Sequence, residues 1–378
     1  MRGPAQRHAP ELDLFVPGLL GPVDASVAAM LDGQPRAALQ PLQRLLRRAR
    51  PARCAPGYLH ALAERVGAQG LGAAAVTRLA DGGTPDGACW LRADPVALQA
   101  GLDSATLLTA DLDLSAAEVA ELVAAANALL ADRGLELEPL ARDRWYLRLP
   151  DSASSAPPDA PPPEEQAGAN IATALPPDRE AKRWHALATE LQMLLHQSAV
   201  NAAREAQGRR PINALWLWGA GRLPASGAWR PELGGVLADE PFARGLGIAA
   251  GVPVCPLAPS LAATDAAAVA TALDRLDTQR REHAPNRPAR LVVVLDQLLR
   301  PLRHGDLACW HTGLLAVSQT WLPALEQALR TGRLARLTLF AGRGQRYDIA
   351  RGRLVGVSGR IPLPALGRGQ RPSTLFIE

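Results

Sequence analysis

The feature that most constrains the fold is an alternation of short apolar runs with helical patterns in the second half of the chain. These runs are INALWLW (212–218), VPVC (252–255), LVVVL (291–295) and LARLTLFA (334–341). Strands that are buried on both faces have such continuous apolar sequences, and parallel strands need crossover connections that are usually helical. We therefore predict an α/β core with a mainly parallel sheet.

A connector rich in proline divides the chain. Residues 150–168 read PDSASSAPPDAPPPEEQAG and contain no large apolar side chain. Such a segment cannot bury enough apolar surface to offset the entropy lost on ordering. We predict a flexible linker over residues 150–176.

Just before this linker, a helix and a strand are predicted. Ser115 and Glu118 have capping-box spacing at the start of the run 114–134, which ends at Gly134. An apolar stripe follows along one face of this helix. The run RWYLRL (144–149) then has the composition of a strand.

Composition describes an ordinary soluble protein. The chain has 378 residues, a formal net charge of +4 and 48% hydrophobic residues. Four cysteines lie far apart without a C-x-x-C pair, which predicts free thiols instead of a zinc site or a disulfide framework. The N-terminus is a poor signal peptide, and no apolar run of about 18 residues is present. We expect a cytoplasmic protein without a membrane span. The single lysine, Lys182, fits the codon bias of a GC-rich bacterial genome.

A glycine turn follows the first apolar run and raises the question of nucleotide binding. Gly219-Ala220-Gly221 leads into Arg222-Leu223-Pro224, where no helix begins. A dinucleotide site requires G-x-G-x-x-G opening a helix, and a phosphate loop requires G-x-x-x-x-G-K-[ST]. The chain contains neither motif, so nucleotide binding is not favoured.

The segment around this turn resembles a known family. HQSAVNAAREAQGRRPINALWLWGAGRLP (196–224) is similar to the archaeal-type, cofactor-independent phosphoglycerate mutases, which carry V-N-x-x-R, then G-x-x-P-x-N, then W-L-x-G-x-G. The chain also resembles the proteobacterial RpfE-type regulatory group through ADPV (93–96) and NALWLWG (213–219). The residues that fill the mutase pattern are Val200, Asn201, Arg204, Gly208, Pro211, Asn213, Trp216, Leu217, Gly219 and Gly221.

The resemblance implies an alkaline-phosphatase-like layered α/β core with an inserted α+β cap domain. The first part of the core would then be residues 1–84, the cap 85–185, and the second part of the core 186–378. The glycine turn would bring the chain from cap to core beside a pocket for a phosphorylated substrate.

The resemblance also implies catalytic machinery: two divalent metals and a Ser or Thr nucleophile. Metals are needed because a negatively charged phosphoryl group repels an alkoxide. The family has Asp-Gly after its first strand, where this chain has Val16-Pro17-Gly18, and Asp13 lies inside the strand. The family's Asp-His after a later strand is replaced by the run 340–343, FAGR.

The remaining ligand group, D-E-x-x-H, is represented only by Asp296 and His304, which are weak metal candidates because eight positions separate them. We therefore expect a catalytically silent relative with a regulatory or phosphometabolite-sensing role and no cofactor. The alternative is an active mutase or phosphatase with shifted ligands, which would use Mn or Zn.

Five residues of the motif are candidate substrate ligands: Asn201, Arg204, Asn213, Gly219 and Gly221. Asn201 and Arg204 lie three apart and share a helical face, so they could bind a phosphate or carboxylate. They could equally be polar residues at a helix end. Asn213 could face the pocket, but a bond to a neighbouring loop is favoured because an unpaired buried amide is costly.

Several other residues have structural interpretations. Trp216 and Trp218 should share one face of a strand and pack in a core. Arg92 and Asp94 could form a local pair, and His196 is expected on the surface or in a core.

The arginine-rich segment 331–378 could bind an anionic protein surface or be solvated. Nucleic acid is the less favoured partner because exposed aromatic residues do not accompany the arginines.

Overall fold

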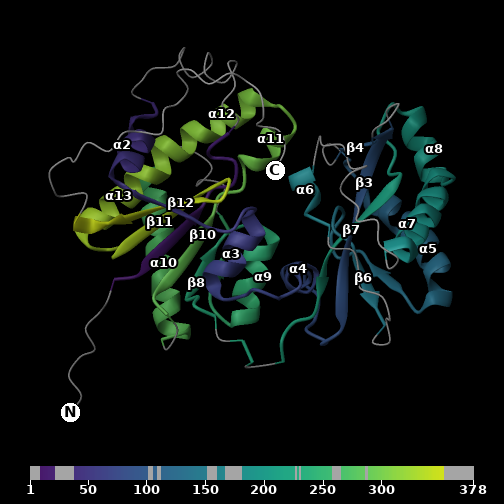
Figure 1. The fold of residues 1–378 in the computed structure, drawn as a ribbon, viewed down its shortest axis with the longest axis horizontal. Helices are drawn as coiled ribbons and strands as arrows, with labels where there is room; N and C mark the ends of the chain where they lie inside the picture. The colour runs from purple at the N-terminus through teal and green to yellow at the C-terminus, as the bar shows by residue number, and fades with distance from the viewer. Residues whose placement is uncertain are drawn as a thin grey trace. The chain divides into compact units, whose positions relative to one another are not determined.

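The computed structural model describes residues 9–21, 38–100, 105–108, 112–150, 160–166, 181–225, 228–229, 231–257, 265–285 and 288–352. The chain forms two compact units (Figure 1). The core unit comprises Met1–Gly67, Glu232–Ala243 and Gly251–Glu378, and the inserted unit comprises Ala68–Pro231 and Arg244–Ala250. An insertion into an α/β core was expected, but its bounds differ from the predicted 85–185.

The core unit contains the predicted mainly parallel sheet. Its strand order is β2-β12-β11-β1-β10-β8-β9, and β1 lies between β10 and β11 in parallel register. Strand β12 runs antiparallel to β11, and the edge strand β2 pairs antiparallel with β12, so β2 runs in the same direction as β11 and β1. The strands are β1 (Glu11–Phe15), β2 (Arg50–Arg53), β8 (Gly235–Leu237), β9 (Val254–Cys255), β10 (Arg290–Val294), β11 (Arg336–Gly342) and β12 (Gln345–Ala350).

Helices cover both faces of this sheet, as the continuous apolar runs predicted. Leu12 and Leu14 of β1 belong to a hydrophobic cluster that includes residues of α2, α10 and α13. Side chains alternate along a strand, so Asp13 and Phe15 face the other side, where both contact α3. The helices of this unit are α2 (Gln40–Arg48), α3 (Tyr58–Val66), α10 (Ala266–His283), α11 (Leu299–Arg303), α12 (Leu307–Ala316), the π-helical η4 (Val317–Trp321) and α13 (Leu322–Thr331), and α9 (Pro241–Ala250) begins here.

The inserted unit is built on an antiparallel sheet of order β4-β3-β6-β5, with β7 paired to β3. Strand β7 contains most of the run that we expected in the parallel sheet, so that expectation was wrong. The run is apolar because α7 packs on β7 together with α4, and such burial does not reveal strand direction. The strands are β3 (Cys89–Ala100), β4 (Ala105–Leu108), β5 (Glu136–Glu138), β6 (Tyr146–Leu149) and β7 (Ala214–Gly221).

The predicted helix of the inserted unit is confirmed together with its cap. Both hydrogen bonds of the capping box are present between Ser115 and Glu118 at the start of α5. Gly134 adopts φ 63°, the left-handed conformation typical of a helix end. The helices are α4 (Ala73–Ala80), α5 (Ala116–Leu130), the short 3₁₀ turn η1 (Ala131–Arg133), α6 (Pro163–Gln166), α7 (Ala181–His196) and α8 (Ala199–Ala206).

Part of the predicted linker is ordered against the sheet. Residues 160–166 include α6, and Ala160 and Pro163 are buried there. The Pro161 carbonyl accepts a hydrogen bond from Trp216 Nε1 at 2.9 Å. The rest of the linker, 151–159 and 167–176, lies outside the described residues. Proline has little backbone entropy to lose, so a proline-rich run can pack without a large apolar side chain.

Two expectations from composition can be compared with the structure. Cys54, Cys89, Cys255 and Cys309 are free thiols. Among the helices of the described ranges, none has the length and apolar content needed to cross a membrane.

Candidate functional site

The carboxyl edge of the parallel sheet carries three acidic side chains. Asp239 and Glu240 follow β8, and Asp296 follows the neighbouring parallel strand β10. Burial raises the pKa of Glu240 and that of Asp296, and a neighbouring carboxylate adds to each effect: Asp296 in the case of Glu240, and Asp239 in the case of Asp296. Open α/β sheets bind ligands outside the carboxyl ends of their strands. This edge is therefore the candidate functional site.

Glu240 is held by three donors. The Tyr58 hydroxyl donates to Glu240 Oε2 at 2.5 Å. The backbone amides of Phe242 and Ala243 donate to the same carboxylate at 2.9 and 2.8 Å, so Glu240 caps the first turn of α9. Burial, followed by the charge of Glu240, raises the pKa of Tyr58 well above its ordinary value. Burial also raises the pKa of Glu240. Tyr58 therefore remains a protonated donor at neutral pH.

Aromatic rings occupy the ends of the two strands beside this site. Phe15, the last residue of β1, stacks on Phe340 of β11 with ring centroids 4.0 Å apart. Phe15 also meets the Tyr58 ring edge-on, with centroids 6.0 Å apart. The resemblance to the mutases placed carboxylates and histidines after these strands, whereas this part of the edge is aromatic.

The weak metal candidates Asp296 and His304 lie at different places, Asp296 after β10 and His304 after α11. Burial raises the pKa of Asp296, and the charge of Asp239 adds to this effect. His304 follows the last residue of α11. Within the described ranges, no group of three or more His, Cys, Asp or Glu side chains is arranged to hold a metal ion.

Asp13 lies in the interior of the core unit. Its side chain is fully buried, and Arg65 Nε and its terminal nitrogen donate to the two carboxylate oxygens at 2.8 and 2.9 Å. Arg290 Nε lies 3.6 Å from the same carboxylate. Asp13 thus joins β1 to α3 through a two-point ion pair.

Sequence reasoning missed Tyr58, Asp239 and Glu240. The available signal was the pair Asp239-Glu240 directly after the run GGVLA (234–238), which reads as a short strand followed by carboxylates. No local pattern indicates Tyr58, because its partner Glu240 is 182 positions away in the sequence.

The structure gives Asn201 a structural role in the inserted unit. Its side-chain amide donates to the carbonyls of Leu195 and Ile212 at 2.7 and 2.8 Å, and its oxygen accepts from the Ile212 amide at 2.8 Å. Asn201 is only 2% exposed. It therefore links the end of α7 to the segment that enters β7.

Arg204 is committed to protein partners in the same way. Its Nε donates to the Arg210 carbonyl at 2.7 Å, one terminal nitrogen donates to Glu118 Oε1 at 2.9 Å, and the other donates to the Leu112 carbonyl. The residue is 1% exposed. A phosphate at Arg204 would have to displace these groups. Asn201 and Arg204 share a helical face, as predicted, and that face points into the unit.

Glu118 joins the capping box to this arginine. Burial raises the pKa of its carboxyl, but hydrogen bonds from the Ser115 amide and from Arg204 outweigh burial and lower the pKa of Glu118 from 4.5 to about 2. The folded state therefore favours the charged form more than the unfolded chain does.

This shift predicts a pH-dependent stability. The contribution of Glu118 is fully present above about pH 4.5 and is lost as pH falls toward about 2, because the unfolded chain binds the proton first. Glu118→Gln should therefore be less stable than wild type at pH 7, with the gap closing toward pH 3. Urea unfolding at pH 7, 5, 4 and 3 measures this gap. An equal gap at every pH would contradict the assignment.

Asn213 extends the pairing of β3 and β7. Its side-chain oxygen accepts from the Leu98 amide at 2.7 Å, and its side-chain nitrogen donates to the Leu98 carbonyl at 2.9 Å. The amide side chain thus replaces a backbone pair just before β7 begins. The sequence favoured such a structural role, but the partner Leu98 lies in strand β3 and not in a loop.

The two glycines of the turn allow close packing of β7 against α4. A Cβ at Gly221 would lie 2.6 Å from Gly72 Cα, and a Cβ at Gly219 would lie 3.0 Å from Ala73 Cβ. Gly219 also has φ 67°, a conformation that side chains disfavour. The close approach of β7 to the start of α4 accounts for both glycines.

A buried ionic and aromatic cluster lies on the face of the inserted sheet that α4 covers, where Arg92 donates to the Thr77 hydroxyl. Arg92 and Asp94 form the predicted local pair at 2.7 Å, and both are buried. Trp218 Nε1 donates to the other oxygen of Asp94 at 2.7 Å. Trp216 and Trp218 are both buried, as predicted, and each also makes a hydrogen bond. His196, the last residue of α7, is exposed.

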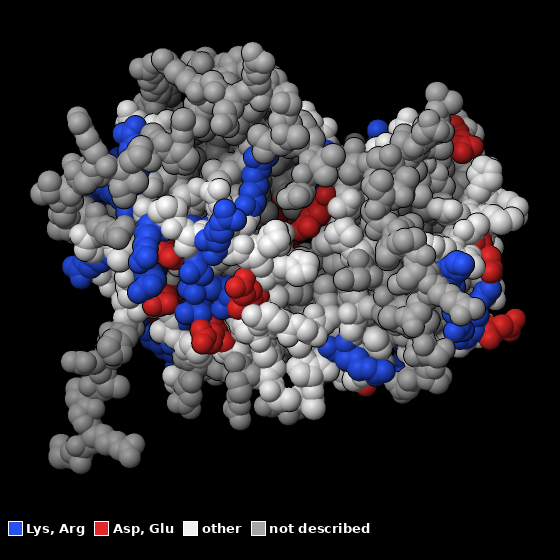
Figure 2. Space-filling view, viewed as in Figure 1, with Lys and Arg blue, Asp and Glu red and all other residues white. Residues whose placement is uncertain are grey.

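The arginine-rich segment is partly described, and three of its described arginines have acidic neighbours. Arg333 pairs with Asp274, Arg336 lies 3.7 Å from Glu11, and Arg346 lies 3.8 Å from Asp348. On the face shown in Figure 2, basic side chains lie among acidic ones. The arginines at 353, 360, 368 and 371 lie outside the described residues.

Comparison with known proteins gives partial matches. No family model matches the chain. A probable 2,3-bisphosphoglycerate-independent phosphoglycerate mutase of Geobacter sulfurreducens is 30% identical over 96 residues, 25% of this chain and 24% of that protein. The 2,3-bisphosphoglycerate-independent phosphoglycerate mutase of Methanosarcina barkeri is 27% identical over 144 residues, 37% of this chain and 36% of that protein. The matches therefore span about a quarter to a third of these relatives.

Two solved structures align with most of the chain, but with low sequence identity and low TM-scores. A cofactor-independent phosphoglycerate mutase from Thermoplasma acidophilum has a TM-score of 0.42 and 17% identity, covering 90% of this chain and 89% of that one. A Pyrococcus horikoshii protein has a TM-score of 0.48 and 12% identity, covering 91% and 88%. In sequence, the chain is distantly related over part of its length to the 2,3-bisphosphoglycerate-independent phosphoglycerate mutases.

Proposed function

We propose that this protein is a relative of cofactor-independent phosphoglycerate mutase, with an alkaline-phosphatase-like scaffold, that no longer transfers phosphoryl groups. In this proposal it binds a phosphorylated metabolite or a protein partner in the cytoplasm, in a regulatory role like that expected for the RpfE-type group. The observation that carries the proposal is the two-point ion pair between Asp13 and Arg65.

The ion pair matters because of what metal-assisted phosphoryl transfer needs. Metals must neutralise the transferring oxygens and activate the nucleophile, and they bind carboxylate oxygens directly. Asp13, the carboxylate nearest the end of β1, has both oxygens bonded to a guanidinium. Glu240 has its oxygens bonded to Tyr58 and two backbone amides. Metal binding at either residue would require these bonds to break.

Calorimetric titration of Mn²⁺ into protein that has been stripped with chelator and dialysed tests the proposal. We expect no tight binding, and no Mn²⁺-dependent interconversion of 3- and 2-phosphoglycerate. A melting-temperature increase with 3-phosphoglycerate in the absence of metal would fit the sensing role. Tight binding of about two equivalents of Mn²⁺, with mutase turnover, would overturn the proposal.

A second candidate function is an active metal-dependent mutase or phosphatase with shifted ligands, using Mn or Zn. The observation that favours it is the gathering of Asp239, Glu240 and Asp296 at the ends of β8 and β10. In this case Asp296→Asn should abolish both Mn²⁺ binding and turnover. Asp306→Asn is a matched control, since Asp306 caps α12 through the Cys309 amide.

A further inference from the structure

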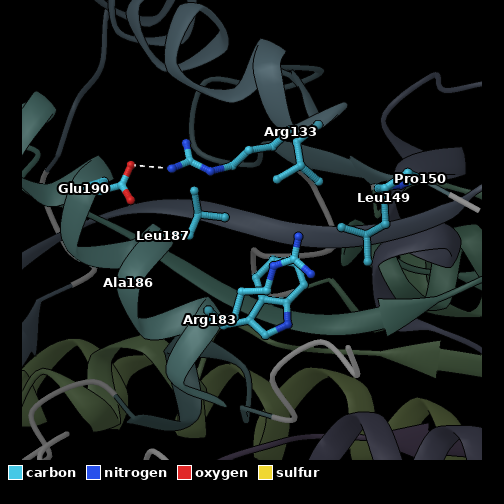
Figure 3. A pocket seen from close by; sticks show the side chains of 9 residues that line it. Arg133, Leu149, Pro150, Arg183, Ala186, Leu187 and Glu190 are labelled. Carbon is cyan, nitrogen blue, oxygen red and sulfur yellow. Dashed lines mark hydrogen bonds and ion pairs between the residues drawn. The ribbon is translucent and has the colours of Figure 1, made fainter. Parts of the chain in front are cut away.

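A cavity in the inserted unit lies between α7 and the turn that connects α5 to β5, next to the end of β6. Its volume is about 170 Å³. Figure 3 shows the side chains around it. Its lining consists of Arg133, Leu135, Leu149, Pro150, Arg183, Trp184, Ala186, Leu187 and Glu190.

The inner wall of this cavity is apolar. Leu149, Trp184 and Leu187 are buried members of the hydrophobic cluster of the inserted unit, and Leu135 packs against that cluster. The cavity is thus a notch that reaches the hydrophobic core. Apolar cavities of roughly 150 Å³ admit a benzene ring, so this one can hold a body of similar size.

The charged residues of the lining differ in how they are paired. Arg133 donates to Glu190 Oε2 at 2.6 Å and to the Leu129 carbonyl at 3.1 Å. These bonds fix the side chain of Arg133, and the Glu190 carboxylate neutralises its charge. Arg183 is exposed and has no hydrogen-bond or ion-pair partner among the described residues. In Figure 3 its side chain projects from α7 into the space that the labelled residues surround. Two arginines and one glutamate leave one positive charge in excess.

We propose that this cavity binds a small amphipathic monoanion, an aromatic or short aliphatic monocarboxylate. The apolar body would lie against Leu149, Trp184 and Leu187, and the carboxylate would pair with Arg183. Arginine binds carboxylates through two parallel hydrogen bonds, and a single excess charge matches one carboxylate. This site is separate from the carboxyl edge of the parallel sheet, so it does not depend on the proposed function.

Three probes with the same aromatic body and different charge test the proposal: phenylacetate, 2-phenylethanol and 2-phenylethylamine. Saturation-transfer NMR titration of the full chain measures each affinity. We expect phenylacetate to bind about fivefold more tightly than 2-phenylethanol, the size of one ion pair near a surface, and 2-phenylethylamine to bind most weakly. Equal affinity for the anion and the amine, or no binding of any probe, would overturn the proposal.

Variants of exposed residues separate this site from nonspecific binding. Arg183→Glu should weaken phenylacetate binding about tenfold and reverse the preference toward 2-phenylethylamine. Ala186→Trp should fill the cavity and remove binding of all three probes. Arg142→Glu is the matched control, because Arg142 is exposed in the same unit and does not line the cavity. Unchanged binding in Arg183→Glu, or equal loss in Arg142→Glu, would refute the assignment.

Discussion

Arg204→Ala is expected to lower the free energy of unfolding of the inserted unit by about 3–5 kcal/mol, the usual cost of removing one partner from a buried ion pair. The side chain is 1% exposed, and its removal leaves the Leu112 and Arg210 carbonyls without this donor and takes a buried ion-pair partner from Glu118. Urea unfolding followed by tryptophan fluorescence measures the change, because Trp145, Trp184, Trp216 and Trp218 all belong to this unit.

Arg209→Ala is the matched control for Arg204→Ala. Arg209 bonds the same Glu118 carboxylate at 3.0 Å, but its side chain is 32% exposed against 1% for Arg204. A pair that remains in contact with water contributes about 0–1 kcal/mol, so the control should lose little stability. Retained stability in Arg204→Ala together with lost 3-phosphoglycerate binding would instead make Arg204 a ligand residue.

Asp13→Ala is expected to destabilise the core unit by about 3–5 kcal/mol. The substitution removes a fully buried carboxylate and leaves Arg65, whose side chain is 20% exposed, without its main partner. Arg290 is affected less, since it keeps ion pairs with Glu232 at 2.7 Å and Glu11 at 3.3 Å. The measurement is the midpoint and free energy of urea unfolding, read by circular dichroism.

The double variant Asp13→Val with Arg65→Leu distinguishes the net contribution of the ion pair from the cost of leaving one charged partner unpaired. Replacing both members of a buried ion pair by apolar residues is often neutral, so the double variant should be more stable than Asp13→Ala. If Asp13 were instead a metal ligand, Asp13→Asn would abolish Mn²⁺ binding while costing little stability. That result would favour the active-enzyme alternative.

Local signals in the sequence were enough for many elements. Ser115 and Glu118 predicted the start of α5, since both partners of a capping box lie within one turn. The runs 291–295 and 334–341 coincide closely with β10 and β11 and pair with β1 in parallel, as continuous apolar runs predict. These features depend on residues close in sequence or on burial alone.

The candidate site was harder to predict from the sequence, because its contacts join residues that are far apart in the chain. Asp296 was identified through the family's D-E-x-x-H ligand group, which the resemblance places after the strand 291–295, whereas Tyr58 and Glu240 were not identified. Asn201 and Arg204 matched a family pattern that suggested ligands, yet each is bonded inside the unit. A motif match gives the type of residue at each position. Only the residues that surround a polar side chain in the folded protein decide whether it faces solvent or the interior.

By itself, the sequence determined the class of fold and the apolar character of its strands, because these follow from periodicity and burial. The expectation of an inserted domain came from the family resemblance instead. The tertiary structure decided which sheet INALWLW joins, since an apolar strand can pair in parallel or antiparallel. It also decided which carboxylates are already bonded. Asp13 pairs with Arg65 and Glu240 with Tyr58 only after the chain brings together residues 52 and 182 positions apart, a contact that no local pattern encodes.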